Sequence, residues 1–562
     1  FYFSCTMSSS SMMSGGGLGL RARGRGSSAA CGASRGASRP LGLSRALRLA
    51  RTTRQVKVLA VAAPPSTSTS TETRKIQPHP LNDGRVGFVA DNTSNVHVGV
   101  AEPESDSNNN ICTYLEPWDP ASPYANKEWT VYRGVAYDLT PFRNAHPAGN
   151  VLLNLAVGRD ATALFESYHL DPAVAVKRLQ RLPVLEGFPV HLVPRAPYPN
   201  DSDLYNTIRE RVKNELFPDG AARRGEHRTG SEWAGLTVLV TFVSTAALYV
   251  STANVLAAAA FGLAGAWVGL TVQHCGNHGA MARDWRINLF WGAMDDLIGG
   301  SSLCWRYHHQ VSHHVHCNDT DMDEDVYSAY PLIRFDARLP RKPWHKYQHI
   351  YMWLAFPFMQ LAFQVGDLKA FFEKRTEGAV MHGAAAWERG SILVGKAAHY
   401  MLLFIVPCML HGWVAACVGA TIYMMIQGIA LASVFAVSHN TFTNKDPNLL
   451  EVDDTRDDWG LQQLITSANW GGRVGCFFTG GLNLQIEHHL FPAISFMHYP
   501  AIAKIVEEEA NKRGYPYVHH KTLPSILGEF IRFMKTAGEA PDSVQSSFPP
   551  AGGLGSAARQ SA

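Results

Sequence analysis

The chain has 562 residues, which is too long for one ordinary domain. Its formal net charge of +3 is close to neutral, so nothing in the overall charge indicates a nucleic-acid partner. Nine cysteines occur without a Cys-x-x-Cys pair or a regular spacing, which argues against a disulfide framework or a zinc ribbon and favours a reducing compartment.

The first segment, residues 1–63, is rich in Arg, Ser, Ala and Gly, and Glu72 is the first acidic residue of the chain. It contains no apolar run long enough for a secretory signal. An acid-free segment rich in Arg and Ser is typical of an organelle transit peptide, and the alternative is a disordered basic tail. Residues 64–115 contain a Ser-Thr repeat and a polar Asn-rich stretch, which predict a disordered linker.

The next segment, residues 116–195, is predicted to be a small globular domain. The stretch EWTVYRGVAYDLTPF alternates apolar and polar residues, as short strands do. His146 follows it, and His169 ends a predicted helix with an apolar face. Two such histidines can bind a flat apolar macrocycle from both sides. Ligation by two histidines saturates the iron and suits electron transfer, whereas the alternative is two ordinary surface histidines.

Two stretches of this domain, YDLTPFRNAHPAGN and GRDATALFESYH, resemble the cytochrome b5 family. The resemblance implies a haem b group held by His146 and His169. In place of the usual His-Pro-Gly-Gly turn, this chain has Ala148 and Asn150 on either side of Gly149. Alanine tolerates a positive φ poorly and asparagine tolerates it better, so we expect a slightly different turn at the first ligand.

Two pairs of apolar segments follow, and each segment is about long enough to cross a bilayer. The segments are Ala234–Val250 and Val255–Thr271, then Ile392–Leu410 and Trp413–Val437. Both pairs read as helical hairpins, and the arginines that flank the first pair place the N-terminal domain and the later histidines on one side of the membrane. A fifth apolar run, residues 351–365, contains Pro357 and is predicted to be interfacial or re-entrant.

Histidines cluster just beyond the ends of these segments. The three groups are His274 with His278, His309 with His313 and His314, and His488 with His489. Residues four apart share one face of a helix, so each group can present imidazoles to a metal. His439 lies beyond the last apolar segment, and Gln485 stands three residues before His488. We predict one shared metal site, against the alternative of separate interfacial histidines.

The chemistry of imidazole alone fits iron, copper or zinc. A neighbouring haem domain delivers single electrons, which zinc cannot use, so a redox metal is expected. The acidic run NDTDMDEDVY follows the second histidine group, but it lacks the glycine and the glutamate that a calcium loop needs. We expect it to be a solvated loop or to contact the histidines.

Three histidine groups on two helical hairpins, behind a cytochrome b5-like domain, resemble the membrane front-end fatty acyl desaturases over roughly residues 117–535. Gln485, at the head of the third group, is itself a mark of that family. The stretches WRYHHQVSHH and HHLFPAISFMHYPAI look closest to the Δ4 members. With the transit-like N terminus, the resemblance implies a plastid Δ4 desaturase of a green alga.

The resemblance also implies the cofactors and the residues that hold them. Two non-haem iron ions are expected at the histidines His274, His278, His309, His313, His314, His488 and His489. His439 matches an additional ligand of related desaturases, although a histidine at a helix end is the alternative. Gln485 is expected either to bind iron weakly through its oxygen or to act through a neighbouring ligand or water.

The expected activity is formation of a cis double bond in a lipid-linked polyunsaturated acyl chain. Its partners are O2, the membrane lipid and an electron donor of the cytochrome b5 reductase or ferredoxin type, with no nucleic acid. The alternatives are a Δ5 or Δ6 desaturase, a sphingolipid desaturase or an acyl hydroxylase on the same scaffold, and a membrane electron carrier. Hydroxylation would require oxygen rebound before a second hydrogen is removed.

The expected fold is an all-α membrane domain of two helical hairpins with a histidine-rich cap that faces the stroma or cytosol. A small α+β domain and a disordered N terminus precede it. After the haem domain we place a linker at residues 196–232, the membrane domain at 233–535 and a flexible tail at 536–562. A plastid membrane is expected, and the endoplasmic reticulum is the alternative.

Overall fold

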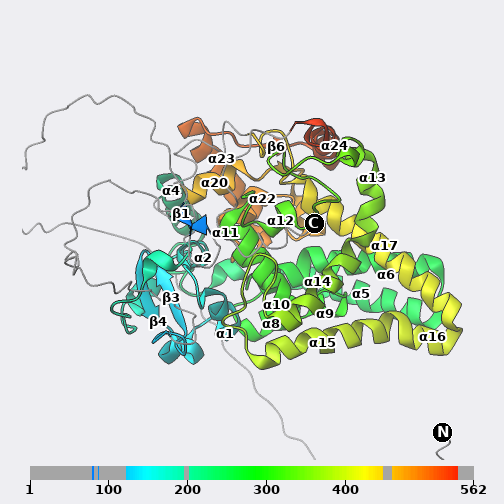
Figure 1. Cartoon of the computed structure of the whole chain (residues 1–562), viewed down its shortest axis with the longest axis horizontal. Coiled ribbons are helices and arrows are strands. Elements are labelled where there is room, and N and C mark those ends of the chain that lie inside the picture. The colour runs from blue at the N-terminus through cyan, green and yellow to red at the C-terminus, as the bar shows by residue number, and fades with distance from the viewer. Residues whose placement is uncertain (1–78, 81–85, 88–121, 195–201, 447–457, 542–562) are drawn as a thin grey trace, which may run out of the picture. The chain divides into compact units, whose positions relative to one another are not determined.

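The computed structural model describes residues 79–80, 86–87, 122–194, 202–446 and 458–541 (Figure 1). The predicted transit segment 1–63 and most of the predicted linker and tail lie outside these residues. Residues Gln77–Ala562 belong to one compact unit. Its first described elements are two short antiparallel strands, β1 (His79–Pro80) and β2 (Val86–Gly87).

The N-terminal region has an antiparallel strand pair, β3 (Trp129–Tyr132) and β4 (Val135–Asp138), in which Val131 lies opposite Ala136. Short helices follow the strands, as expected for an α+β domain. They are η1 (Thr140–Ala145), α1 (Gly149–Leu153), η2 (Asn154–Ala156), α2 (Thr162–Tyr168), α3 (Pro172–Leu179) and η3 (Val190–Leu192). Trp129 and Val131 pack with Phe188 in one small core.

A connecting segment leads from this region to the first long helix. It contains α4 (Asp203–Arg211), the π-helix η4 (Val212–Leu216) and η5 (Glu226–Arg228). Ser202 caps α4 by accepting a hydrogen bond from the backbone of Tyr205. Tyr205 is buried, so this segment packs against the rest of the molecule.

The first apolar pair forms the predicted helical hairpin. It consists of α5 (Glu232–Thr252), α6 (Val255–Val268), the π-helix η6 (Gly269–Gln273) and α7 (His274–Asn277). Ala253 takes a left-handed φ of 47° at the turn, and the Asn254 side chain caps the second helix. Along α5, the hydroxyls of Thr237 and Thr241 donate to carbonyls four residues earlier, which satisfies them in apolar surroundings.

The second apolar pair forms a hairpin of α15 (Ala386–Tyr400), η10 (Met401–Ile405), α16 (Val406–His411) and α17 (Trp413–Val437). Helices α6 and α17 lie side by side (Figure 1). Their backbones approach closely at Gly262, where an added Cβ would lie 2.7 Å from the Tyr423 carbonyl oxygen. Small residues permit such close packing between membrane helices.

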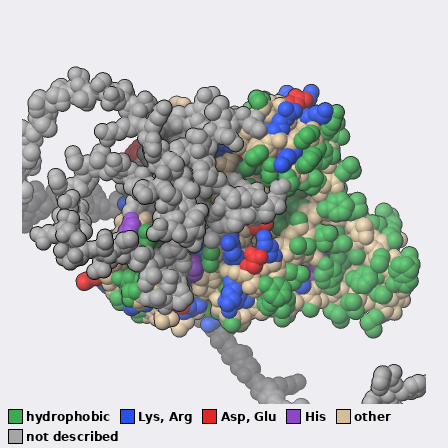
Figure 2. All heavy atoms as spheres, viewed as in Figure 1, with side chains coloured by type: hydrophobic (Ala, Val, Ile, Leu, Met, Phe, Trp, Pro, Cys, Tyr) green, Lys and Arg blue, Asp and Glu red, His purple; other side chains and the backbone are tan. Residues whose placement is uncertain are grey.

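Four helices of the described residues are long and apolar enough to cross a membrane, as predicted. They are Glu226–Thr252, Val255–Asn277, Ala386–His411 and Trp413–Val437. Figure 2 shows mostly hydrophobic and uncharged side chains over α15 to α17, where Val394, Met409 and Trp413 are exposed. An apolar exposed surface of this kind suits a lipid environment.

The segment between the hairpins is built of short helices. They are α8 (Trp285–Gly292), α9 (Met294–Leu297), α10 (Ser302–Trp305), the π-helix η7 (Arg306–His313), α11 (His314–His316), α12 (Glu324–Tyr327), η8 (Pro343–Tyr347), α13 (Gln348–Ala355), η9 (Phe356–Phe358) and α14 (Met359–Glu373). The fifth apolar run is interrupted at Phe356–Phe358, beside Pro357, and it is not among the four candidate spans. Its interfacial or re-entrant position stays a prediction.

The C-terminal cap contains α20 (Trp459–Ile465), β5 (Asn469–Trp470), α21 (Arg473–Thr479), α22 (Gln485–Leu490), η11 (Phe496–His498), α23 (Tyr499–Arg513), β6 (His519–His520) and α24 (Leu523–Glu539). Strands β5 and β6 pair in parallel. Helix α24 continues past residue 535, where we placed the end of the membrane domain. Helix α22 carries the third histidine group into the core of the cap.

Candidate metal centre

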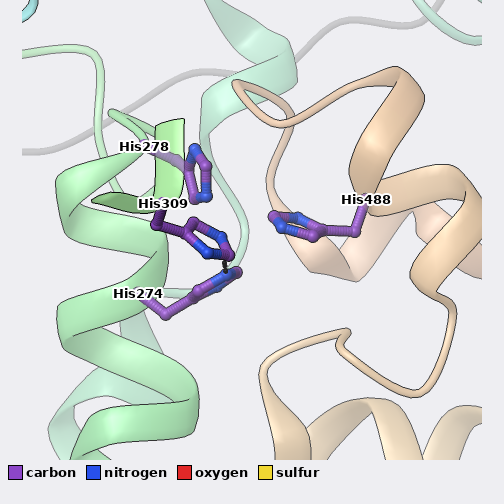
Figure 3. Close-up of side chains that lie close together, drawn as sticks. All are labelled: His274, His278, His309 and His488. Atoms are coloured by element: carbon purple, nitrogen blue, oxygen red, sulfur yellow. Dashed lines mark hydrogen bonds between the residues drawn. The ribbon is translucent and has the colours of Figure 1, made fainter. Parts of the chain in front are cut away.

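The first group of imidazoles comes from three separate parts of the chain. His274 begins α7 and His278 follows it, His309 lies in η7, and His488 lies in α22. All four are buried, and their ligand nitrogens lie within 4.8 Å of one another. Figure 3 shows His274, His278 and His309 facing His488 across a small gap. The structure therefore joins both members of the first predicted group with one member each of the second and third.

The second group contains His313, His439 and His489, together with Cys317. These four residues are also buried, with ligand atoms within 4.8 Å of one another. His439 thus lies with His313 and His489, and its role as a metal ligand stays a prediction. Cys317 was missed from the sequence, because a single cysteine without a partner at metal-ligand spacing carries no signal.

His314 lies between the two groups. Its Nε2 is 3.1 Å from His309 Nε2 and 3.0 Å from His488 Nε2, and its ring stacks on His489 with centroids 4.3 Å apart. We expected His309 and His313, four residues apart, to share a face. They do, because their rings are stacked with centroids 5.3 Å apart and their ligand atoms form a further group with Asp325. Because η7 is a π-helix, whose hydrogen bonds span five residues, His309 also meets His314 nitrogen to nitrogen.

The Nδ1 atoms of several histidines form hydrogen bonds with neighbouring polar groups. His489 Nδ1 lies 2.8 Å from Gln463 Oε1, which can only accept, so the imidazole donates there. His313 Nδ1 lies 3.1 Å from an Asp323 carboxylate oxygen. A histidine that donates through Nδ1 keeps the lone pair of Nε2 for a metal. The acidic run thus contacts the histidines, and Asp323 is buried rather than solvated.

Burial sets the charge state of these rings. It is the main cause that lowers the pKa of His309, His314 and His488 well below the usual range, with neighbouring imidazoles adding to it. Burial likewise lowers the pKa of His439 to about 3. These four rings are therefore neutral near pH 7, which is the form that binds metal ions. At His313 burial is outweighed by the Asp323 and Asp325 carboxylates, which raise the pKa of that ring.

The arrangement fits bound metal. His278 Nε2 and His489 Nε2, one from each group, are buried and have no hydrogen-bond partner. A buried polar atom normally has one, and a bound metal would supply it. Several Nε2 atoms also approach one another closely, so their lone pairs repel. A bound cation would remove this repulsion. Imidazole donors of this kind suit iron.

Gln485 lies beside the second group. Its amide nitrogen is 2.8 Å from His439 Nε2, and His439 Nδ1 is 3.0 Å from the carbonyl oxygen of Thr466. His439 thus donates through Nδ1, and its Nε2 accepts a hydrogen bond from the glutamine amide. Of the two expected roles for Gln485, these contacts favour action through a neighbouring histidine.

The predicted haem ligands also face each other. The ring centroids of His146 and His169 are 6.4 Å apart and their planes are nearly perpendicular. Two metal–nitrogen bonds of about 2 Å each, plus half of each ring, add up to about this separation. His146 Nδ1 lies 3.3 Å from the Gly149 carbonyl and His169 Nδ1 lies 2.7 Å from the Phe165 carbonyl, which leaves each Nε2 for iron.

The unusual turn at His146 is accommodated without strain. Gly149 takes the positive φ of 75°, whereas Ala148 has a φ of −88°. A Cβ at Gly149 would also lie 2.6 Å from the Trp285 ring, so only glycine fits. The one glycine of the Ala148-Gly149-Asn150 turn therefore lies at the position that needs a positive φ.

We expect His146→Ala and His169→Ala each to abolish the reduced-minus-oxidised haem spectrum while the protein stays in the membrane fraction. Each variant removes one axial ligand of a six-coordinate iron. His191→Ala, on the same domain, is the control and should keep the spectrum. A normal haem spectrum in either ligand variant would contradict the assignment.

One contact was not anticipated from the sequence. Tyr168 belonged to the apolar face of the predicted haem helix, but its hydroxyl oxygen lies 2.6 Å from His278 Nδ1. Further hydrogen bonds join the same two regions: Asn154 Nδ2 donates to Glu388 at 2.8 Å, and the Tyr307 hydroxyl donates to the Asn154 carbonyl at 3.2 Å. Sequence patterns within one region contain no signal for contacts with another.

Comparison with known families and proteins agrees with this geometry. The family description "Fatty acid desaturase" matches residues 250–521, and "Cytochrome b5-like Heme/Steroid binding domain" matches residues 123–190. The chain is 59% identical over 415 residues to "Acyl-lipid (7-3)-desaturase, chloroplastic" of Chlamydomonas reinhardtii, covering 73% of this chain and 80% of that protein.

Two more distant relatives match a similar share of this chain. "Acyl-lipid (7-3)-desaturase" of Rebecca salina is 31% identical, over 74% of this chain and 91% of the relative. "Delta(5) fatty acid desaturase A" of Dictyostelium discoideum is 28% identical, over 75% of this chain and 92% of the relative.

Proposed function

This chain belongs to the fatty acid desaturases and carries a cytochrome b5-like domain, and from that premise we propose that it forms a cis double bond at Δ4 in a lipid-linked polyunsaturated acyl chain. The observation that carries the proposal is the pair of adjacent, buried imidazole groups next to long apolar helices. The Δ4 position is supported by the stretches WRYHHQVSHH and HHLFPAISFMHYPAI, which resemble those of Δ4 desaturases.

We assign the imidazoles to two iron ions. One set is His274, His278, His309 and His488, and the other is His313 and His489, with His314 between them. His439 would join the second set when its Nε2 exchanges the Gln485 amide for iron. Bound iron supplies the activation of O2 that removal of hydrogen from an unactivated methylene requires. Burial holds the imidazoles of His309, His314, His439 and His488 neutral, and the protein orients several rings through their Nδ1 atoms and excludes water from the site.

The electron count of the reaction explains the haem domain. Reduction of O2 to two waters takes four electrons, and formation of one C=C bond supplies two of them. The other two enter one at a time, which suits a haem with two histidine ligands. The external donor is of the cytochrome b5 reductase or ferredoxin type.

Product analysis tests the proposed activity. We would express the full chain in a host supplied with candidate polyunsaturated acids and map new double bonds by mass spectrometry. A new cis double bond at Δ4, formed only with O2, is the expected result. A bond at Δ5 or Δ6 would contradict the position, and a hydroxylated product would contradict the reaction type. Haem reduction without any acyl change would instead indicate an electron carrier.

We place the protein in a plastid membrane, with the haem domain and histidines on the stromal side. The Arg- and Ser-rich, acid-free segment 1–63 and the chloroplastic relative support this location. A fluorescent protein fused after residue 115 should enter plastids, and deletion of residues 1–63 should prevent this. An endoplasmic reticulum pattern from the intact segment would contradict the location and leave the activity unaffected.

A further inference from the structure

The hydroxyl of Tyr168 connects the two redox regions of the chain. Tyr168 is the last residue of α2 and precedes the haem ligand His169, and its oxygen lies 2.6 Å from His278 Nδ1. We propose that Tyr168 is the electron relay from the haem to the first imidazole group. This inference rests on the proposed function, since it takes the haem as donor and the iron pair as acceptor.

The hydrogen-bond directions around Tyr168 are determined by Gln310. The Gln310 amide nitrogen donates to the Asn277 carbonyl at 2.9 Å, so Oε1 of Gln310 must accept the Tyr168 proton at 2.8 Å. The Tyr168 oxygen then accepts from Nδ1 of His278. The unpartnered Nε2 of His278 is left with its lone pair for the metal. Gln310 therefore sets the tautomer of His278 through Tyr168.

The resulting path has one non-covalent step. It runs from the His169 ring through the peptide bond to the Tyr168 side chain, and then across a 2.6 Å hydrogen bond to the His278 ring. Electron tunnelling weakens steeply across through-space gaps, and a short hydrogen bond is a smaller gap than a van der Waals contact. The Tyr168 and His278 rings are also only tilted by 33°, with centroids 6.1 Å apart.

The contacts that position α2 are strong enough to keep this hydrogen bond in place. Glu166, two residues before Tyr168, is buried and pairs with Arg209 of α4 at 2.7 Å. The Tyr205 hydroxyl donates to the Glu166 backbone carbonyl at 3.3 Å. Removing one partner of a buried ion pair leaves an uncompensated charge, so α2 resists displacement.

Each transfer is a balanced one-electron exchange. The haem iron is oxidised from Fe(II) to Fe(III), and the metal centre at the imidazoles is reduced by one electron. The Tyr168 phenol keeps its proton, which stays in the hydrogen bond to Gln310. Two such transfers supply the two electrons that the acyl chain does not provide.

Tyr168→Phe removes only the hydroxyl and retains the ring. In the full, iron-loaded chain we expect an unchanged haem spectrum and iron content. After the haem is rapidly reduced, its oxidation by the metal centre should slow by roughly tenfold or more, because a longer van der Waals gap replaces the 2.6 Å hydrogen bond. The rate is followed by stopped-flow absorbance.

Tyr307→Phe is the matched control. It also removes a hydroxyl that joins the two regions, at 3.2 Å from the Asn154 carbonyl, without a contact to a histidine of the first group through that hydroxyl. Its haem oxidation rate should stay close to that of the unmodified chain. Equal slowing in both variants would mean that loosened docking, and not the relay, limits the rate, and would overturn the proposal.

A second measurement separates a relay from a positioning role. Enzyme whose haem and metal centre are both chemically reduced beforehand needs no internal transfer, so Tyr168→Phe should then form product in a single turnover as the unmodified chain does. Loss of iron in Tyr168→Phe, or an unchanged haem oxidation rate, would overturn the relay. If the unmodified chain forms no double bond but its haem is oxidised by the loaded centre, the proposed function fails while the relay can still be tested.

Discussion

Replacing His488 with alanine is expected to remove both the bound iron and all measurable desaturation. His488 Nε2 lies 3.0 Å from His314 Nε2, and its ring centroid lies 4.5 Å from that of His274. It is the member of the first group that the C-terminal cap contributes (Figure 3). Loss of an outer partner of a metal ligand already costs about 10- to 100-fold, so loss of this ligand should exceed 100-fold.

Iron content per protein and product formation measure this effect. The control is His411→Ala, at the exposed turn of the second hairpin, where Nε2 contacts only the Val250 carbonyl. That variant should keep its iron and its activity. Normal iron in His488→Ala would show that this residue is not a ligand.

Both Gln485→Ala and Gln485→His are expected to lose most of the desaturation, by about 10- to 100-fold. Alanine leaves the buried Nε2 of His439 without its hydrogen-bond donor at 2.8 Å. Histidine is shorter in reach and more rigid than glutamine, so it would move His439 or bind iron itself. Either change alters the second group and the position of the acyl chain relative to the metal.

Gln427→Ala is the matched control for Gln485. Gln427 is also buried, and its amide donates to the Ile298 carbonyl at 3.1 Å in the membrane-helix region. This variant should lose some stability while its iron content stays normal. Full activity with normal iron in Gln485→Ala would mean that Gln485 only packs against its neighbours.

The helical hairpins and the site residues follow from local sequence patterns. Hydropathy over about twenty residues marks a bilayer-crossing helix regardless of its partners, so α5, α6 and α17 agree with the predicted segments. Hydropathy does not locate the ends of these helices, because caps and turns such as that at Ala253 and Asn254 determine where a helix begins and ends. The strands and the opposed histidines of the haem domain were likewise predicted from short-range patterns.

Only the tertiary structure decided how the histidines are divided and oriented. The π-helix η7 brings His314 into contact with His309, while His313 lies near both His309 and the second group. Whether a helix forms π-type or α-type hydrogen bonds depends on packing, so the spacing of histidines in the sequence does not predict it. Which ring nitrogen is free depends on partners far away in the chain, such as Gln463 for His489.

The sequence by itself determined the membrane hairpins, because hydropathy is a local property, and i, i+4 spacing marked the histidine groups. The haem ligand pair and the full set of iron ligands came from the family resemblance and stay predictions. The tertiary structure alone decided the hydrogen bond of Gln485 to His439, the inclusion of Cys317 and the contact of Tyr168 with His278. Each of these joins segments that are distant in the chain. Their proximity results from the packing of the whole unit, which no local pattern encodes.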